Sequence, residues 1–342
     1  MRRRHPSHIT AVAIATVVLF AAHAVRASHL ALPDPEFGLC LGNAKRFDGL
    51  RINLRDRGVE RIRGVNLTLW VPAKNDEARI HGLAVGLMAP AGRKLSGISV
   101  GGLGVAAEDV RGIAIGTLGV GTDVDARGIL IGGLGAGTGA SLSGIGIGGL
   151  GIGAGADVTG IVIGGLGAGA GGSLRGIGIG GLGIGAGDDI TGIVIGGLGA
   201  GAGRNVSGIG IGGLGIAAGE NLRGIALGGL AVGAGKAAKG LAIAGGAIGG
   251  EERIHGVAVA GGWLRTRRLT GLGVTAGYVS CEDLVGVGVG SLVRVRDTQR
   301  GITIGLLNLA RRLHGVQVGL LNHARNNPRG LQWLPVLNLH LR

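Results

Sequence analysis

The sequence predicts an all-β fold, a single β-solenoid of about nineteen repeats that are each 15 or 16 residues long. Three observations support this prediction: a glycine that recurs at a fixed step, apolar residues that alternate with a spacing of two, and a Gly-Gly pair that interrupts each alternating run. The step is sixteen residues through the centre of the chain, where the opening glycines are Gly144, Gly160, Gly176, Gly192, Gly208 and Gly224. We expect these glycines to have a structural role, because a short fixed period is the signature of a repeat architecture.

The composition favours strands over helices. The chain has 79 glycines in 342 residues, and each glycine inside a helix costs about 1 kcal/mol relative to alanine. Its apolar side chains are small or branched, and aromatic residues make up only 2% of the chain. In the repeat that opens at Gly160, Ile161 and Ile163 are two positions apart and therefore share one face of a strand.

A bend inside each repeat distinguishes a solenoid from a straight strand. After Gly164 and Gly165 the apolar residues move to the other parity, so a straight strand would divide them between two faces. A corner at this pair would bring them to one side, because glycine accepts positive φ angles without steric cost. The pattern predicts an inward-facing set in this repeat, consisting of Val158, Ile161, Ile163, Leu166 and Ala168. The variable residues before the next opening glycine are expected in exposed turns in register with one another, as at Asp157, Ser173, Asp189, Asn205 and Asn221.

An antiparallel up-and-down β-barrel, with one strand per repeat, is the alternative fold. The central repeats alternate in type, which gives a super-period of 32 residues, and the joints alternate between acidic (Asp157, Asp189) and basic (Arg175, Arg204) residues. Up-and-down strands would place these two kinds of joint at opposite rims. However, the chain lacks the aromatic girdles and the polar interior that membrane barrels have. Duplication of a two-repeat unit would explain the super-period equally well.

The chain divides into three parts. Residues 1–27 have the pattern of a secretory signal peptide, with basic residues at Arg2–Arg4, an apolar core over Ile9–Ala22 and small residues at two candidate cleavage sites. An uncleaved anchor helix is the alternative for this segment. Residues 28–48 are expected to form a lead-in or cap, and residues 49–342 a glycine-rich β-repeat domain without a linker. The two cysteines, Cys40 and Cys281, are expected to be unpaired and buried as small apolar groups.

The net charge of +14 is concentrated at the two ends of the chain. The same degenerate end repeats contain the tryptophans Trp70, Trp263 and Trp333, and we expect them to cap the array. A basic patch can serve nucleic acid, an anionic membrane surface or solubility alone. No nucleic-acid motif accompanies the charge and base-stacking aromatic residues are scarce, so we expect no nucleic-acid partner.

The last three repeats carry a family resemblance. They read GITIGLLNLARRLH, GVQVGLLNHARNNPR and GLQWLPVLNLHLR, from Gly301 to Arg342. This pattern of G-V-Q-x-G-L-x-N resembles the bacterial surface repeat-containing proteins named from Leptospira. The resemblance implies an exported protein of the cell envelope or surface, with envelope or surface components as partners, and it brings no established activity with it.

The asparagines of this motif, Asn308 and Asn322, occupy one register of the repeat, which Gly151 and Gly167 hold in the centre; Asn338 is displaced by one. Asparagines at one register of stacked coils can form a hydrogen-bonded ladder along the axis. The alternative is that they are isolated turn residues.

No residue pattern predicts chemistry. Gly144, Gly146 and Gly149 match G-x-G-x-x-G, but that fingerprint requires a following helix, which this sequence excludes. The histidines His81 and His255 directly precede an opening glycine, as does His314, which indicates an exposed turn position and not a ligand set. Carboxylates are irregular along the repeats, and no zinc-binding spacing occurs. We therefore expect no catalytic, metal or cofactor-binding residues, and no enzymatic activity.

These observations predict an exported, non-enzymatic repeat protein of the cell surface or envelope with a structural or adhesive role. Two alternatives stay open at this point: an outer-membrane β-barrel protein, and a binder of anionic surface polymer through the basic ends. Membrane association remains compatible with all three predictions.

Overall fold

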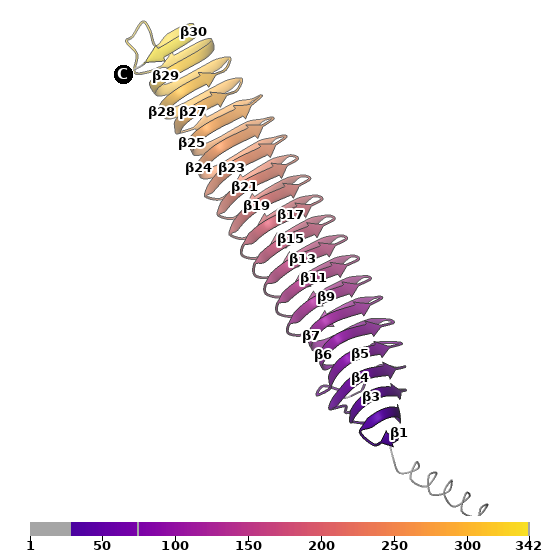
Figure 1. Ribbon diagram of the computed structural model, residues 1–342. Coiled ribbons are helices and arrows are strands. Elements are labelled where there is room, and N and C mark those ends of the chain that lie inside the picture. The colour runs from indigo at the N-terminus through magenta and orange to yellow at the C-terminus, as the bar shows by residue number, and fades with distance from the viewer. Residues whose placement is uncertain (1–28, 74, 341–342) are drawn as a thin grey trace, which may run out of the picture. The chain divides into compact units, whose positions relative to one another are not determined.

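The structure is a computed structural model that describes residues 29–73 and 75–340. It consists of two compact units, divided between Thr138 and Gly139, and the predicted signal peptide lies outside the described residues. Every regular element among the described residues is a strand (Figure 1). Each unit is a β-solenoid by itself, and the two contain about 17 turns. The all-β solenoid prediction is therefore confirmed.

The first unit contains ten strands, which are β1 (His29–Asp34), β2 (Phe37–Gly42), β3 (Arg46–Asn53), β4 (Arg61–Thr68), β5 (Arg79–Gly86), β6 (Ala91–Gly101), β7 (Gly104–Gly116), β8 (Gly119–Thr122), β9 (Ala126–Gly132) and β10 (Gly135–Thr138). The second unit begins with ten shorter strands, which are β11 (Leu142–Gly148), β12 (Gly151–Ala154), β13 (Val158–Gly164), β14 (Gly167–Ala170), β15 (Leu174–Gly180), β16 (Gly183–Ala186), β17 (Ile190–Gly196), β18 (Gly199–Ala202), β19 (Asn205–Gly212) and β20 (Gly215–Ala218). It continues with β21 (Asn221–Gly228), β22 (Ala231–Ala234), β23 (Ala237–Ala244), β24 (Ala247–Ala260), β25 (Trp263–Thr275), β26 (Tyr278–Cys281), β27 (Asp283–Val289), β28 (Leu292–Ile304), β29 (Leu307–Ala324) and β30 (Trp333–His340).

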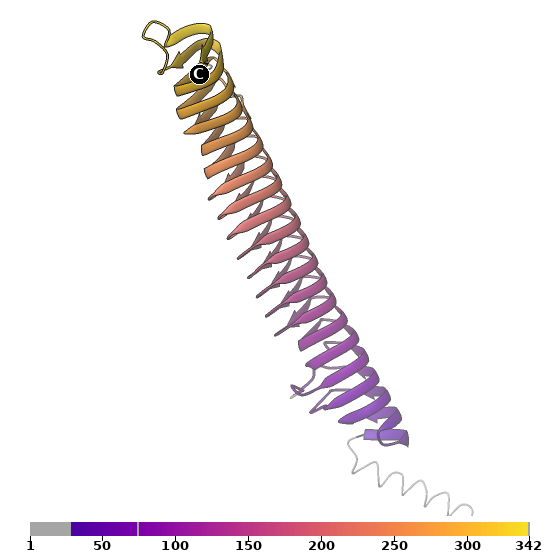
Figure 2. The same cartoon turned by 60° about the vertical axis from the view of Figure 1, so that its left-hand side comes forward.

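One coil consists of a long strand and a short strand, as β13 and β14 show. The long strand β13 pairs in parallel with β15, and the short strand β14 pairs in parallel with β16. The register is one repeat, with Gly160 opposite Gly176. The turned view in Figure 2 shows the long and short strands as two separate stacks within the second unit. The alternative with antiparallel strands is wrong, because successive long strands run in the same direction.

The opening glycines hold a backbone conformation that other residues rarely adopt. Gly176 has φ of +127°, and a Cβ atom there would overlap the carbonyl oxygen of Gly160 in the preceding coil. Positive φ recurs at every predicted opening glycine from Gly49 to Gly315. Gly330 is the exception, since it lies in a turn and the strand after it, β30, runs antiparallel to β29. The solenoid has about 17 turns, fewer than the nineteen repeats that the sequence predicts.

The predicted inward-facing set is wrong for three of its five members. Val158 and Ala168 are buried, at 0% and 7% exposure, but Ile163 and Leu166 are exposed and Ile161 is half-buried. The inward positions of β13 and β14 are the even-numbered ones on both sides of the Gly164-Gly165 corner. The corner thus preserves parity, and the largest apolar side chains of the repeat lie on the outside.

The 32-residue super-period is a packing pattern in this thin interior. In one coil Gly178 faces Ile184, whose Cδ1 atom occupies the space that a Cβ on Gly178 would need. In the next coil the corresponding inward residues are Val194 and Ala200, both buried. A large residue on the short strand is thus matched by glycine on the long strand, and a small one by valine. Volume is conserved from coil to coil, as close packing requires.

The lead-in forms a hairpin at the start of the first unit. Strands β1 and β2 are antiparallel, and β2 then pairs in parallel with β3. Behind this hairpin lies a buried polar network. Arg51 is fully buried, and its Nη1 donates hydrogen bonds to Asp56 Oδ1 and Asn66 Oδ1, both at 2.6 Å. Such a pair is strongly destabilised when one partner is removed, because a buried charge then lacks compensation.

At the C-terminal end of the second unit the interior also becomes polar. Gln299, Thr303 and Gln317 are fully buried, and Gln317 Nε2 donates to Gln299 Oε1 at 3.0 Å. The antiparallel strand β30 follows at this end. Within the described residues, no helix is long and apolar enough to cross a membrane.

Candidate interaction surfaces

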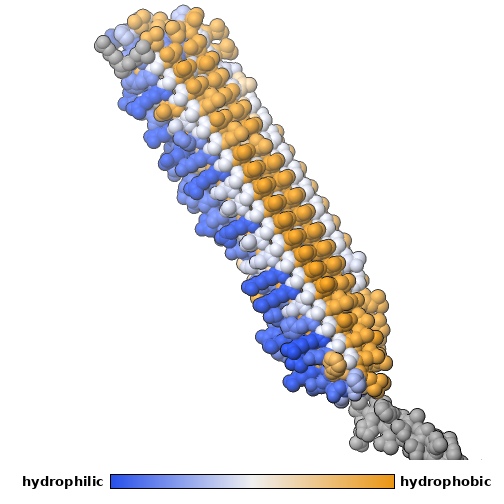
Figure 3. Space-filling view, viewed as in Figure 1, coloured by the Kyte–Doolittle hydropathy of each residue, from blue (hydrophilic) through white to orange (hydrophobic). Residues whose placement is uncertain are grey.

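The second unit has a polar edge, formed by the turns that lead from each short strand to the next long strand. Figure 3 shows it as the blue margin of this unit. Joint charges from successive coils lie next to one another here, with Arg204 bonded to Asp188 (3.2 Å) and Asp189 (3.1 Å), and Lys236 to Glu220 (3.0 Å). The alternation of joint charge therefore reflects pairing between neighbouring coils. Exposed pairs of this kind add only about 0–1 kcal/mol each to stability.

The predicted turn residues stack along the same edge. Asn205 Nδ2 donates to Asp189 Oδ1 at 2.8 Å, and Asn221 Nδ2 donates to Asn205 Oδ1 at 2.9 Å. Two coils before the first of these contacts, the backbone N–H of Ser173 donates to Asp157 Oδ1 at 2.7 Å. Side-chain hydrogen bonds thus add to the backbone hydrogen bonds that connect successive turns, such as that from Arg204 N–H to the carbonyl oxygen of Asp188 at 2.8 Å.

Beside the polar edge lies an apolar face. We define it as the first, third and sixth residues after each opening glycine from Gly144 to Gly224, which are all isoleucine or leucine. Figure 3 shows these residues as continuous orange rows. The leucines at the sixth position are about half exposed, from 49% at Leu198 to 60% at Leu230. Scattered exposed leucines are ordinary, but a contiguous apolar patch of this kind marks an interaction site.

The short strands present the opposite character. Their outward residues in the centre of the second unit are mainly glycines, such as Gly153 and Gly169, and we call this surface the glycine face. These glycines have no positive φ, and an added Cβ would meet at most ordinary contacts, the nearest at 3.9 Å from Gly153 and 3.5 Å from Gly169. The backbone conformation therefore does not require glycine on this face, in contrast to the opening glycines.

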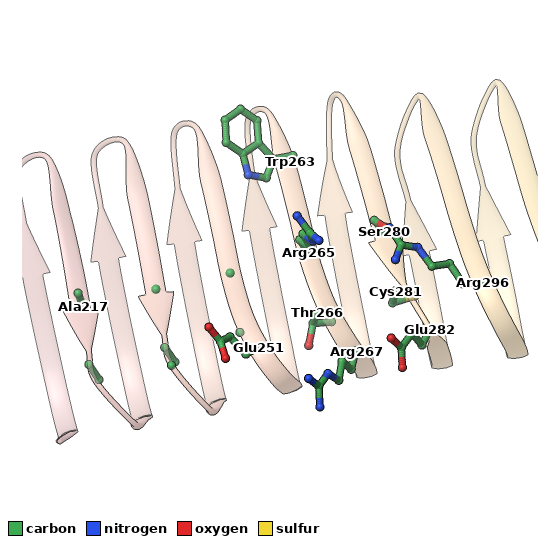
Figure 4. Close-up of a pocket in the computed structure, with 16 residues that line it drawn as sticks. Ala217, Glu251, Trp263, Arg265, Thr266, Arg267, Ser280, Cys281, Glu282 and Arg296 are labelled. Carbon is green, nitrogen blue, oxygen red and sulfur yellow. The ribbon is translucent and has the colours of Figure 1, made fainter.

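Large side chains interrupt the glycine face at β25. There Trp263 and Arg265 follow Ala247 and Gly249 in the same two columns, and a cavity of about 680 Å³ lies at this step. Its lining also includes Arg267, Ser280 and Arg296, with Glu251 and Glu282 at the side of the polar edge (Figure 4). Trp263 is 59% exposed. Sequence reasoning assigned charge and tryptophan to the ends in general but did not bring these residues together, because their proximity depends on the coil register.

The asparagines of the family motif are buried in adjacent coils. Asn308 and Asn322 are both 0% exposed, and Asn308 Nδ2 donates to Asn322 Oδ1 at 2.7 Å. The two asparagines therefore have the hydrogen-bonded arrangement of a ladder and are not isolated turn residues. The predicted register is off by one, since Asn308 continues an inward column through Val293 and Val279. In the centre, the members of that column lie one residue after Gly151 and Gly167, because the corner after Gly301 is one residue shorter than the central corners.

The opening glycines Gly144, Gly160, Gly176, Gly192, Gly208 and Gly224 form one stacked column in the second unit. Their geometry serves the backbone, and no phosphate-binding loop or helix accompanies them in the described residues.

The described part of the chain contains no cluster of three or more potential metal ligands. Both cysteines are buried with free thiols. Burial raises the pKa of Cys281 to about 12, with a contribution from Asp283, which makes this thiol a poor nucleophile. The pKa of His81 is lowered by burial and by neighbouring cations such as Arg63, so this turn histidine is neutral near pH 7.

Comparison with known proteins identifies no relative. The chain matches no protein-family profile, no curated protein and no solved structure.

Proposed function

We propose that this chain is an exported, non-enzymatic structural protein of the cell envelope or surface, which assembles side by side with further copies through the apolar face. The observation that carries the proposal is the unbroken series of partly exposed isoleucines and half-exposed sixth-position leucines over six consecutive coils of the second unit. Export and surface location rest on the signal-peptide pattern of residues 1–27 and on the resemblance of the last repeats.

A second copy fits the apolar face better than other occupants. The face contains eighteen residues, close to the about 20–30 residues that each partner contributes to a stable interface. Both copies present rows with the same spacing, about 4.8 Å between coils, so the leucine rows of one copy can lie between those of the other. The face has no charged residue, and two copies can therefore approach without repulsion.

The test compares the oligomeric state of the full chain with that of two triple variants. Leu166→Gln, Leu182→Gln and Leu198→Gln together replace three exposed leucines of the face. The matched control replaces by glutamine three polar residues of the long strands that directly precede opening glycines, Thr159, Thr191 and Ser207. Light scattering after size exclusion is expected to show oligomers for the wild type and the control, and monomers for the leucine variant.

Two results would overturn lateral assembly: a wild type that is monomeric at micromolar concentration, or a leucine variant that still assembles. Flotation of the monomer with phosphatidylcholine vesicles would identify lipid as the occupant instead. Export is tested separately by fractionation and N-terminal sequencing, and an unprocessed chain that stays in the cytosol contradicts it.

A further inference from the structure

We propose that the cavity beside Trp263 and Arg265 binds an acidic carbohydrate. The cavity lies on the glycine face, formed by the short strands, whereas the apolar face is formed by the long strands and the corner after them. The inference is therefore independent of lateral assembly. Its volume of about 680 Å³ is within the usual range of ligand sites, about 300–1,000 Å³.

The arginines of the cavity have no ion-pair partner in the described residues. On the polar edge nearby, Arg268 is paired with Asp283 and Arg312 with Asp297. Arg265, Arg267 and Arg296, in contrast, form no ion pair there, although Glu251 and Glu282 also line the cavity. Unpaired guanidinium groups are well suited to carboxylate, sulfate or phosphate groups, which they can bind with two parallel hydrogen bonds.

Two of these arginines are directed to one place. Figure 4 shows the side chains of Arg265 and Arg296 extending over the sheet from different coils, close to Ser280. Ser280 directly follows Arg265 in an outward column and is only 2% exposed. The two guanidinium groups therefore form a local positive site above the sheet, while Glu251 and Glu282 lie nearer the turn.

The other groups favour a sugar over a simple anion. Trp263 lines the cavity and offers an aromatic surface at one end of it. The unpaired carboxylates of Glu251 and Glu282 are acceptors for hydroxyl groups, but they repel a densely charged polyanion. A ring with hydroxyl groups and an isolated negative charge satisfies all of these groups together.

The floor of the cavity is kept open by glycine. Gly233 and Gly249 line it, and an added Cβ at either position would meet no atom within 4 Å. Substitution there is compatible with the backbone, so a larger side chain would fill the cavity without disturbing the coil.

The test measures binding of a galacturonate oligosaccharide to the full chain by calorimetry, with a neutral glucose oligosaccharide and inorganic phosphate as reference ligands. We expect the acidic oligosaccharide to bind, and Arg265→Gln with Arg296→Gln to weaken it by about tenfold or more, as expected for loss of charge-assisted hydrogen bonds. Gly249→Leu should abolish binding. The control for the arginine variant is Arg175→Gln with Arg223→Gln, which makes the same change of charge away from the cavity. The control for the glycine variant is Gly153→Leu, on the same face but away from the cavity. Both controls should bind the acidic oligosaccharide as the wild type does.

Each contrary result removes part of the proposal. Equal affinity for the neutral oligosaccharide would overturn the acidic specificity, and equal affinity for phosphate would reduce the site to an anion site. Wild-type binding by Gly249→Leu, with its circular dichroism unchanged, would overturn the location. A failure of lateral assembly leaves these results unaffected, because binding is measured per chain.

Discussion

Ile184 and Gly178 share one packing position: the Cδ1 atom of the isoleucine fills the space that a side chain on the glycine would need. The following coil meets the same demand with Val194 and Ala200. The two repeat types therefore fill the same interior volume in two ways, one with glycine and isoleucine and the other with valine and alanine. This relationship leads to a direct test of the interior.

Replacing the glycine and isoleucine pair of one coil by the valine and alanine pair of the next should be tolerated only when both residues change. Gly178→Val alone introduces a clash, and Ile184→Ala alone leaves a cavity that costs about 2–5 kcal/mol. The double variant reproduces the pair of the next coil, so its free energy of unfolding should be within about 1 kcal/mol of the wild type. Denaturant unfolding measures all three. Additive losses in the double variant would contradict the complementarity.

Substitution by alanine should have opposite effects on stability at the opening glycines and at the glycines of the glycine face. Gly176→Ala places a Cβ against the carbonyl oxygen of Gly160 at φ of +127°, and we expect a loss of at least about 1–3 kcal/mol. Gly169→Ala on the glycine face has an ordinary nearest contact of 3.5 Å, and should stabilise by about 0.4–1 kcal/mol. Thermal unfolding of the two variants compares them directly. Equal effects would mean that φ does not decide these positions.

The buried asparagine pair should be sensitive to truncation. Asn322→Ala removes one acceptor of Asn308, which also donates to the carbonyl oxygen of Val318 at 3.0 Å, and it removes the donor to the carbonyl oxygen of Gly319 at 3.0 Å. Unsatisfied buried groups then cost about 1–3 kcal/mol. Asn205→Ala on the polar edge, where this side chain is only partly buried, serves as the control and should cost less than Asn322→Ala. A neutral Asn322→Ala variant, measured by denaturant unfolding, would show that the ladder does not contribute to stability.

The thiol of Cys281 should be inert in the folded protein. Its pKa is raised from 9.0 to about 12, so the reactive thiolate is nearly absent at pH 8. Iodoacetamide should label Cys281 only after unfolding, as measured by mass spectrometry of the peptide. Rapid labelling at pH 8 under native conditions would contradict the burial.

The same shift has a consequence for stability. Because the folded state holds the thiol proton more tightly, this group's contribution is complete below pH 9 and is lost as pH rises toward about 12. The difference in unfolding free energy between the wild type and Cys281→Ala should therefore decrease over that interval.

The period, the opening glycines and the solenoid class could be predicted because each follows from local rules of spacing and φ. The sequence could not predict which face of the strand points inward. A period of two shows that Ile161 and Ile163 share a face, but it does not show which face is buried when both parities are apolar. Size was a misleading guide, since the interior accommodates valine with alanine and the larger side chains lie outside.

The register of Asn308 failed for a related reason. Counting from the opening glycine assumes that every corner has the same length, whereas the corner after Gly301 is one residue shorter than those in the centre. The cavity at Trp263 was likewise invisible, because Arg265 and Arg296 are thirty-one residues apart in sequence and meet only through the stacking of coils.

Because each central coil balances its own volume, its long and short strands need no particular neighbour. A single sixteen-residue coil can therefore be gained or lost without repacking those beside it, even though the visible repeat in the sequence is 32 residues. Length in the second unit becomes a variable that can change in small steps. Each step extends or shortens the apolar rows by three residues and changes the reach of the surface, while the groups around Trp263 keep their local arrangement.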